Sequence, residues 1–551
     1  MSRQFVSLLL ILLLLQGLSY AQSQKPPGVE IPKGAKPAPL PDYFMLALTD
    51  PGCDPDEDCD DVGPKKVYRN WYIEHTGCNW GGTSFSWAEC EKVKGKYDFS
   101  SITMSEHDRK MKFKVCYIGC GGAKWIVDPG QGIGPAWAEK DNFKFEIGPD
   151  GKKRVSDRYW QAYEKFVEAA CRYVRQKYGI TIFQTGGNER DLVARDVYKD
   201  FYRDWHFYYM APIVHIHAAM KRAHPDNKLI IGSMCYTDRA HVNALYDAGA
   251  KGNFEILSLH AYGHAGVHVD MYQIIEAHNA LAEHGDGHIG LVIEEGWSCF
   301  PLPERIDKDP ILRKGARVYT AEDIEHYRQT VLDGWRNIMT PRKGEYDPKW
   351  VVGARYFVLN DHWGGRGWEK RAKAEYDENG KLKGFHLDGY WIGTDDPNWI
   401  KPFLRPWGLI DIEGKPKGDI IFSFPPYLPK HDFEVLFEDA VNDNRIVAGK
   451  EYRLVVKFTN REKTPMTNFR MDMIGRDEPA KKVKFRYTGG DDVTTIAPGQ
   501  TITRRYVVVY PEELVGADPY RARGFADAYY TWNGRLYHTD AWLPKLPIVK
   551  Q

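Results

Sequence analysis

The chain has 551 residues, and its 75 Lys and Arg residues balance 75 Asp and Glu residues, so its formal net charge is zero. This balance excludes a dedicated nucleic-acid binder, because affinity for a phosphate backbone comes from concentrated Lys and Arg. Hydrophobic residues make up 43% of the chain and charged residues 27%, which excludes a disordered polymer and allows a large core. At about 150 residues per domain, we expect more than one domain.

The first 24 residues have the pattern of a secretory signal. Arg3 supplies a positive charge, residues 8–15 form an unbroken apolar run, and Ser19-Tyr20-Ala21 matches a small-x-small cleavage site. The apolar run is shorter than the about 20 helical residues that span a bilayer. We therefore predict a signal peptide over residues 1–21, a secreted or periplasmic protein, and no membrane span after cleavage.

Nine cysteines are present, and six of them lie between Cys53 and Cys120. In an oxidising compartment, such crowding favours disulfides that brace the N-terminal loops. An odd number leaves at least one thiol unpaired, and Cys171, which lies in a helical pattern, is the candidate. Cys116 and Cys120 lack His or Cys partners at zinc-finger distances, so a disulfide or a buried thiol is favoured there over a metal.

A Pro-rich leader over residues 22–42 precedes an acidic segment, Asp50 to Gly63, which holds six Asp and one Glu in fourteen residues. Hard oxygen ligands at this density could hold calcium. The order of an EF-hand loop is absent, because no Gly at the sixth position is followed by a Glu at the twelfth. We therefore favour a solvated acidic loop closed by Cys53 and Cys59, and we predict no metal and no cofactor.

Between residues 43 and 428, short apolar strands alternate with amphipathic helices. Most of the strands are continuous apolar runs, which is typical of parallel strands covered on both faces. Apolar residues recur every three or four positions over Ser156–Tyr178, where Ser156 can cap, and over Met271–His284 and Thr320–Ile338. The expected strands are Tyr43–Leu48, Lys66–Trp71, Lys112–Ile118, Thr181–Thr185, Leu229–Gly232, Ile256–His260, Ile289–Ile293 and Ala354–Leu359. Eight strands with intervening helices predict an α/β fold of the (β/α)8 TIM-barrel class.

The pattern changes over residues 429–551. Apolar residues recur at every second position over Tyr452–Phe458, and a further strand is expected over Ile502–Val509, after the turn Pro498-Gly499. Phe525–Trp532 gives another strand, and helical spacing is missing from this part of the sequence. These features predict an all-β sandwich as a C-terminal domain.

Polar motifs follow several of the expected barrel strands. In a barrel of this kind, catalytic groups sit where strands end at the carboxyl face. Acidic side chains directly after apolar strands are costly to desolvate, so a fold retains them there mainly for use. Taken singly, each motif could be an ordinary polar loop. The four motifs are Gly186-Gly187-Asn188-Glu189, His260-Ala261-Tyr262-Gly263, Glu294-Glu295-Gly296-Trp297 and Asn360-Asp361-His362-Trp363.

Together these motifs resemble clan A of the glycoside hydrolases, the retaining (β/α)8 enzymes, with families 39 and 5 closest in character. In that clan an Asn-Glu pair ends strand four, and a second Glu in a Glu-x-Gly-Trp context ends strand seven. Asn188-Glu189 and Glu294-Glu295-Gly296-Trp297 match these positions, with the two Glu residues 105 positions apart. Ser258-Leu259-His260-Ala261-Tyr262 matches the strand-six pattern, and Arg69 stands where the strand-two arginine is expected. The resemblance covers roughly residues 43 to 420.

The resemblance implies a role for each of these residues. Glu189 is the acid/base that protonates the leaving oxygen, and Glu294 is the nucleophile that attacks the anomeric carbon. The implied substrate-binding residues are Asn188 for the sugar 2-hydroxyl, Tyr262 as a partner of the nucleophile, His260 and Arg69 for orientation, and Trp363, Trp297 and Trp125 for stacking on a sugar ring.

Other interpretations stay open at several of these positions. Glu295 could be the nucleophile, because a strand buried on both faces has no facing pattern, and only the Glu-x-Gly-Trp register favours Glu294. His260 could be an ordinary interior histidine, Arg69 a structural ion-pair partner, and the tryptophans parts of the core.

The sequence therefore predicts a secreted retaining glycoside hydrolase with a carbohydrate substrate, a β-linked polysaccharide or its oligosaccharides. A first rival is a carbohydrate-binding barrel without activity. A second is an inverting glycosidase that uses other carboxylates, such as Asp361. The sequence leaves open the sugar, the linkage, endo or exo action, the role of the sandwich and any protein partner.

Overall fold

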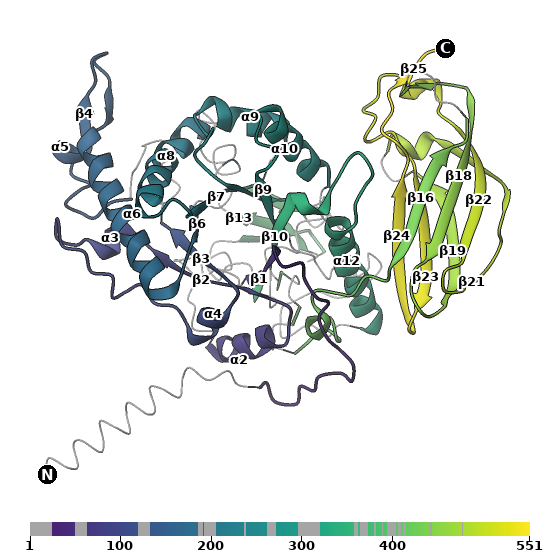
Figure 1. Ribbon diagram of the computed structural model, residues 1–551, viewed down its shortest axis with the longest axis horizontal. Coiled ribbons are helices and arrows are strands. Elements are labelled where there is room, and N and C mark those ends of the chain that lie inside the picture. The colour runs from purple at the N-terminus through teal and green to yellow at the C-terminus, as the bar shows by residue number, and fades with distance from the viewer. Residues whose placement is uncertain are drawn as a thin grey trace, which may run out of the picture. The chain divides into compact units, whose positions relative to one another are not determined.

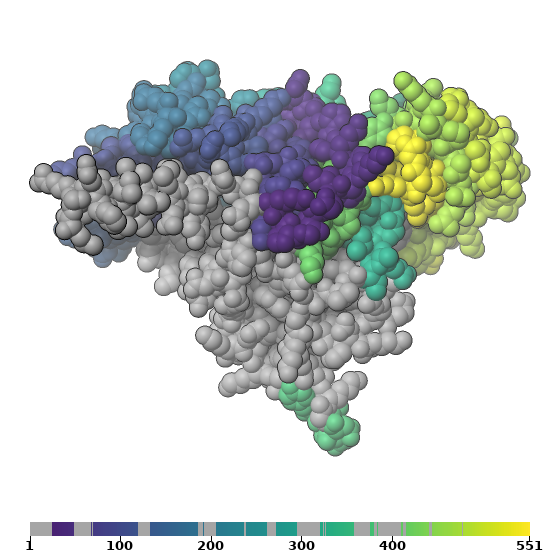
Figure 2. All heavy atoms as spheres, turned by 90° about the horizontal axis from the view of Figure 1, so that it is seen from below, coloured from purple at the N-terminus to yellow at the C-terminus, as the bar shows by residue number. Residues whose placement is uncertain are grey.

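The computed structural model describes residues 25–49, 63–119, 133–185, 191, 205–235, 238–261, 271–295, 320–357, 362–363, 373–379, 382–387, 390–393, 404–405, 409–410, 415–439, 444–475 and 478–551. Residues outside these ranges are drawn in grey in Figures 1 and 2. By their internal contacts, residues 1–324 and 347–425 form one compact unit, and residues 325–346 and 426–551 form a second. Among the described helices, none combines the length and the apolar composition that a membrane span requires.

The first unit is built on an eight-stranded sheet in which neighbouring strands pair in parallel. The strands follow one another around a ring, with helices on its outside (Figure 1). In spatial order they are β1 (Met45–Thr49), β10 (Val351–Phe357), β9 (Gly290–Glu295), β8 (Ile256–His260), β7 (Lys228–Met234), β6 (Ile182–Thr185), β3 (Phe113–Ile118) and β2 (Trp80–Phe85). The predicted (β/α)8 barrel is confirmed.

One expected strand is wrong. Lys66–Trp71 is part of helix α2 (Gly63–Glu74), and the second barrel strand is β2 instead. The apolar residues of the helix continue to Ile73, so their spacing spans helical turns rather than a short strand. Gly81 and Gly82 concealed β2, because glycine is rare in strands. Both are needed there for space, since a Cβ on Gly81 would lie 2.7 Å from the Asp108 carboxylate.

Hydrogen bonds from one asparagine join β1 to the start of β2. The Asn79 side chain accepts from the Leu46 backbone N–H at 2.8 Å and donates to the Phe44 carbonyl at 2.9 Å. The Asn79 backbone N–H also donates to the Leu46 carbonyl at 3.0 Å. These bonds satisfy backbone groups at the place where the ring of strands closes.

Three helices form where the apolar spacing predicts them, namely α6 (Asp157–Tyr178), α10 (Met271–Glu283) and α12 (Ala321–Met339). Ser156 caps α6 by accepting from the Tyr159 N–H, and Gly179 ends this helix in the left-handed conformation, with φ 69°. The helices are α2, α3 (Trp87–Cys90), α4 (Glu106–Lys110), α5 (Asp141–Lys144), α6 (Asp157–Tyr178), α8 (Trp205–Ala223), α9 (Arg239–Asp247), α10 (Met271–Glu283) and the start of α12 (Ala321–Met339), with 3-10 turns η4 (Pro348–Trp350) and η5 (Ile421–Ser423).

Smaller antiparallel sheets pair β4 (Phe145–Ile147) with β5 (Lys153–Val155), β11 (His362–Trp363) with β15 (Leu404–Arg405), and β12 (Lys373–Tyr376) with β13 (Leu382–Leu387) and β14 (Tyr390–Gly393).

A cluster of apolar side chains fills the interior of the barrel, and every strand contributes to it. Side chains from all eight strands can meet only on the inner face of the barrel. A strand residue that belongs to this cluster therefore points inward. The cluster contains Met45, Ala47, Trp80, Phe113, Val115, Ile182, Ile230, Ile256, Val292 and Val352. The cluster lies beneath the carboxyl ends of the strands and supports the side chains at those ends.

The second unit contains two four-stranded antiparallel sheets around one apolar core, which confirms the predicted β-sandwich. One sheet has the order β16 (His431–Phe437), β18 (Glu451–Asn460), β22 (Thr501–Val509) and β20 (Lys484–Gly490). The other has the order β21 (Thr495–Ile496), β19 (Met466–Ile474), β23 (Phe525–Trp532) and β24 (Arg535–Trp542). Further elements are β17 (Ile446–Val447), β25 (Ile548–Val549), η7 (Ala480–Lys482) and η8 (Glu512–Leu514).

Most of helix α12 belongs to this second unit. Leu332 packs into the sandwich core, Arg336 donates to the His538 carbonyl at 2.8 Å, and Arg523 holds the Glu345 carboxylate at 2.6 Å. The two compact units are groups of residues in contact, and they do not test domain limits along the chain. The predicted limits, 43–428 and 429–551, stay predictions.

The disulfide prediction needs a correction at two positions. Cys90 and Cys116 are buried free thiols, although both lie in the cysteine-rich stretch. The Cys116 side chain sits on a barrel strand, and burial raises the pKa of its thiol, which makes it an inert core residue. Cys171 is a free thiol, as expected. Cys53 and Cys59, with the acidic loop around them, lie outside the described residues.

Candidate active site

Glu294 points into the barrel. Val292 belongs to the interior cluster, and side chains two residues apart on a strand share a face, so Glu294 lies on the inner face above Val292. Glu294 is 8% exposed and stands next to the carboxyl end of β9. The sequence left open which of the two glutamates is the nucleophile, and Glu294 is the one that the structure describes on the inner face of the strand.

His260 lies beside Glu294 on the next strand. The last residue of β8, His260, is paired in register with Glu294, and residues paired across parallel strands point to the same face. The His260 Nε2 lies 3.5 Å from Glu294 Oε1, and His260 is 1% exposed. At this distance the His260 ring contacts the Glu294 carboxylate directly.

Arg355 approaches Glu294 from the other side. It is paired in register with Glu294 on β10, and its Nη2 lies 3.2 Å from Glu294 Oε2. Arg355 is 6% exposed. Arg355 belongs to none of the four polar motifs. An arginine inside the otherwise apolar run Val351–Phe357 is nevertheless a signal in the sequence, because a buried cation needs a partner.

Two serines and a glutamine extend the polar cluster below the strand ends. Arg355 Nη2 lies 3.3 Å from the Ser233 hydroxyl and 3.4 Å from the Ser258 hydroxyl. Gln184 Nε2 donates to the Ser233 hydroxyl at 3.2 Å. All of these residues are buried and come from β6, β7, β8 and β10. The Gln184 Oε1 atom has no hydrogen-bond partner within the described residues, so it has a free acceptor position for a water or a substrate group.

Several predicted site residues fall elsewhere. Arg69 lies on helix α2 and not on a strand, because the expected second strand is the wrong segment. Trp363 is on the short strand β11, where it pairs with Leu404. The residues Asn188, Glu189, Tyr262, Trp297, Trp125 and Asp361 lie outside the described ranges. Glu189 follows β6, which ends at Thr185, by four positions.

The donor set of the described cluster is one carboxylate, one imidazole, one guanidinium and hydroxyls. Within the described residues, no group of three or more His, Cys, Asp or Glu side chains could hold a metal ion. A carboxylate between a guanidinium and an imidazole is held in place and charge-compensated. Such a carboxylate can act as a nucleophile or as an electrostatic partner of a developing positive charge.

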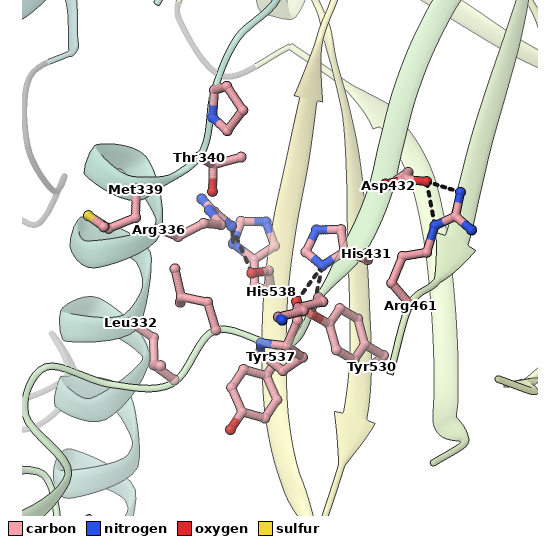
Figure 3. A pocket seen from close by; sticks show the side chains of 14 residues that line it. Leu332, Arg336, Met339, Thr340, His431, Asp432, Arg461, Tyr530, Tyr537 and His538 are labelled. Carbon is pink, nitrogen blue, oxygen red and sulfur yellow. Dashed lines mark hydrogen bonds and ion pairs between the residues drawn. The ribbon is translucent and has the colours of Figure 1, made fainter. Parts of the chain in front are cut away.

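A pocket of about 450 Å³ lies in the second unit, against helix α12 (Figure 3). Its lining includes Arg336, His431, Tyr530 and Tyr537. None of its lining residues is a predicted site residue. Two of its charged groups have partners in the protein, since Arg336 donates to the His538 carbonyl and Arg461 pairs with Asp432.

No protein-family model matches the chain, and no curated protein matches its sequence. Among solved structures, the chain is similar to a β-glucuronidase from Bacteroides uniformis, with 10% identity and a TM-score of 0.35, over 92% of this chain and 46% of that one. The chain therefore spans less than half the length of that protein. A GH39 enzyme from Xanthomonas axonopodis pv. citri is 12% identical, with a TM-score of 0.39, over 89% of this chain and 98% of that one. A β-xylosidase from Caulobacter crescentus is 11% identical, with a TM-score of 0.37, over 87% and 98%. These structural neighbours are glycosidases by name, but at such scores they add no argument about activity, which has to come from the site itself.

Proposed function

We propose that the chain is a secreted glycoside hydrolase that cleaves β-linked polysaccharides or oligosaccharides with retention of configuration. The observation that carries the proposal is the position of Glu294. Its carboxylate stands at the carboxyl end of a barrel strand, on the inner face, between Arg355 and His260. Active sites of (β/α)8 enzymes form at this end of the barrel, and retaining glycosidases need one ionised carboxylate as the nucleophile.

The proposed reaction is a double displacement. A Glu294 oxygen bonds to the anomeric carbon, the glycosidic C–O bond breaks, and the leaving oxygen takes a proton from Glu189. A water molecule then attacks the same carbon, gives its proton to Glu189 and releases Glu294. The assignment of Glu189 rests on the motif resemblance, as do the proposed roles of Asn188 and Tyr262 toward the sugar and the nucleophile. Trp363, Trp297 and Trp125 remain proposed stacking residues on the same basis.

The first experiment is hydrolysis of a panel of aryl β-glycosides and polysaccharides by the purified chain and two matched variants. Glu294→Gln should lower kcat/KM by about a thousandfold or more, because it removes the nucleophile. Glu295→Gln, at the alternative nucleophile that the sequence left open, should stay within about tenfold of the parent. Thermal unfolding of both variants controls for misfolding. Equal losses in the two variants, or activity retained by folded Glu294→Gln, would contradict the assignment.

Stereochemistry separates the proposal from an inverting mechanism. Proton NMR of the first-formed anomer should show the configuration of the substrate. A 2-deoxy-2-fluoro glycoside should leave a covalent adduct on the peptide that contains Glu294. A first product of opposite configuration favours other carboxylates, such as Asp361. Binding of oligosaccharides by a folded protein without any hydrolysis favours a carbohydrate-binding barrel.

Export is part of the proposal and rests on the first 24 residues. Expression of the full chain in a secreting host should give an extracytoplasmic protein that begins at Gln22. Peptide mapping without reduction should then link Cys53 to Cys59. Retention in the cytoplasm with an intact N-terminus would contradict export.

A further inference from the structure

A buried cation lies directly against the proposed nucleophile. Arg355 is 6% exposed, and 3.2 Å separates its Nη2 from Glu294 Oε2. Taking a guanidinium out of water is costly, and apolar residues often fill an interior position at lower cost. A cation kept at this place therefore needs a reason beyond packing.

Three strands besides its own hold the guanidinium. Ser233 on β7 and Ser258 on β8 lie within hydrogen-bond distance of Nη2, at 3.3 and 3.4 Å. The indole of Trp80 on β2 lies across from the guanidinium carbon, at 5.6 Å from the ring centre. The planar guanidinium is thus fixed by neighbours on several sides, which sets the direction in which it meets Glu294.

The anchor Ser233 has an unusual backbone conformation. It is the extra residue where the β7–β8 register shifts between Gly232 and Met234, so it forms a bulge. Its φ is 62°, a left-handed value that is uncommon for a residue with a side chain. Without the bulge, alternation would turn the side chain of Ser233 to the outer face, because Ile230 already points inward. The bulge therefore turns a hydroxyl toward Arg355.

We propose that Arg355 is a positioning residue for Glu294, and that the Ser233 bulge serves to orient Arg355. Arg355 places a positive charge against the Glu294 carboxylate and holds it in one orientation. From the described parts of the neighbouring strands, the charged or titratable groups that face Glu294 are Arg355 on β10 and His260 on β8. The role of Arg355 in catalysis rests on the proposed function. The interaction between Arg355 and Glu294 is independent of that function.

The test uses the full chain with Arg355→Gln, Arg355→Lys and Ser233→Ala. Loss of the guanidinium in Arg355→Gln should move the acidic limb of the kcat/KM profile upward by about one pH unit or more, because the carboxylate loses its cation. Arg355→Lys should restore the profile in part, since an ammonium supplies charge without the planar fork. Ser233→Ala should move it in the same direction by a smaller amount.

A second readout needs no activity. NMR of the chain with carbon-13-labelled glutamate carboxyls, assigned by comparison with Glu294→Gln, follows the titration of Glu294 itself. Arg336→Gln is the matched control, because Arg336 is also buried, at 4% exposure, but lies in the second unit. It should lower thermal stability without moving the Glu294 titration.

The outcomes separate the two proposals. A Glu294 titration that moves in Arg355→Gln and stays in place in Arg336→Gln supports the positioning role, even if no substrate on the panel is cleaved. A titration that is unchanged in folded Arg355→Gln overturns it, even if the parent hydrolyses glycosides. An equal shift in the Arg336→Gln control also overturns it, because the effect would then be one of general stability.

Discussion

Two buried arginines, one in each unit, are held in different ways. Arg336 meets two carboxylates, Asp333 at 3.3 Å and Asp540 at 3.6 Å. It also donates to the backbone carbonyl of His538 at 2.8 Å, and both residues are labelled in Figure 3. Arg355 meets the Glu294 carboxylate at 3.2 Å and two serine hydroxyls. The Arg336 cluster has carboxylates to spare and joins a helix to a sheet, as a structural ion pair does. The Arg355 cluster places its cation against the Glu294 carboxylate at the strand ends.

The contrast extends to a third arginine. Arg523 is 1% exposed and holds both oxygens of Glu345 at 2.6 Å. Its guanidinium carbon lies 4.4 Å from the ring centre of Tyr520 and 4.0 Å from that of Trp542. Its charge is compensated by the Glu345 carboxylate, and the two aromatic rings add cation–π contacts. The difference teaches that burial of a charge alone does not mark a functional site. The place of the charge relative to the strand ends does.

The largest expected effect is on stability in the second unit. Arg523→Ala leaves Glu345 without its cation and removes a stacking partner of Trp542, which should lower the free energy of unfolding by about 3–5 kcal/mol. Urea unfolding followed by tryptophan fluorescence measures the loss. Activity per folded molecule at low temperature should stay near that of the parent. A fall in kcat/KM as large as that of Arg355→Gln would remove the distinction between the two clusters.

The next effect is on pH dependence and comes from His431. Burial lowers the pKa of His431 to about 4, from an ordinary value of 6.5. Its neutral ring donates from Nδ1 to the Pro429 carbonyl at 2.8 Å and accepts at Nε2 from the Thr539 hydroxyl at 2.9 Å. Between pH 6.5 and 4 the unfolded chain binds a proton that the folded chain does not, so stability falls by about 2–3 kcal/mol as pH drops. His431→Gln should flatten the thermal unfolding midpoint over this range.

His538 is the control of opposite sign. Burial opposes its charged form, but hydrogen bonds to Asp333 and Asp527 raise its pKa above the ordinary value. The contribution of His538 to the free energy of unfolding is therefore fully present below pH 6.5 and is lost as pH rises through the raised pKa. His538→Gln should destabilise most at acidic pH and least at alkaline pH. The same pH dependence in both variants would contradict the assigned protonation states.

The smallest expected effect on stability is at Ser233. Ser233→Gly suits the left-handed φ of 62° but removes the hydroxyl beside Arg355. The free energy of unfolding should change by no more than about 1 kcal/mol, because relief of backbone strain offsets the lost hydrogen bonds. Activity should fall by about tenfold if Arg355 loses its orientation. Unfolding and kcat/KM measured on one preparation test this split, and unchanged activity would count against the bulge as an orienting device.

Much of the fold could be predicted from local patterns. Continuous apolar runs indicated seven of the eight barrel strands, and the cap at Ser156 with its three-to-four spacing indicated α6. The strand that was missed, Trp80–Phe85, contains two adjacent glycines. Glycine is needed at these positions because other segments of the chain pack closely against them. A Cβ on Gly82 would lie 2.8 Å from the Val115 carbonyl, a contact that no local pattern contains. The wrong strand then misplaced Arg69, because its assignment depended on the strand count.

By itself, the sequence determined the class of the fold, the strand that carries Glu294, and the acidic motifs after the strands. Those depend on residue type and on spacing along the chain. The tertiary structure decided that Glu294 faces the interior, and that Arg355 supplies the neighbouring cation. These depend on which face of a strand looks inward, and a shift of one residue reverses that face. Register shifts at Ser233 and Val352 set the faces here, and they exist only between strands that have already paired.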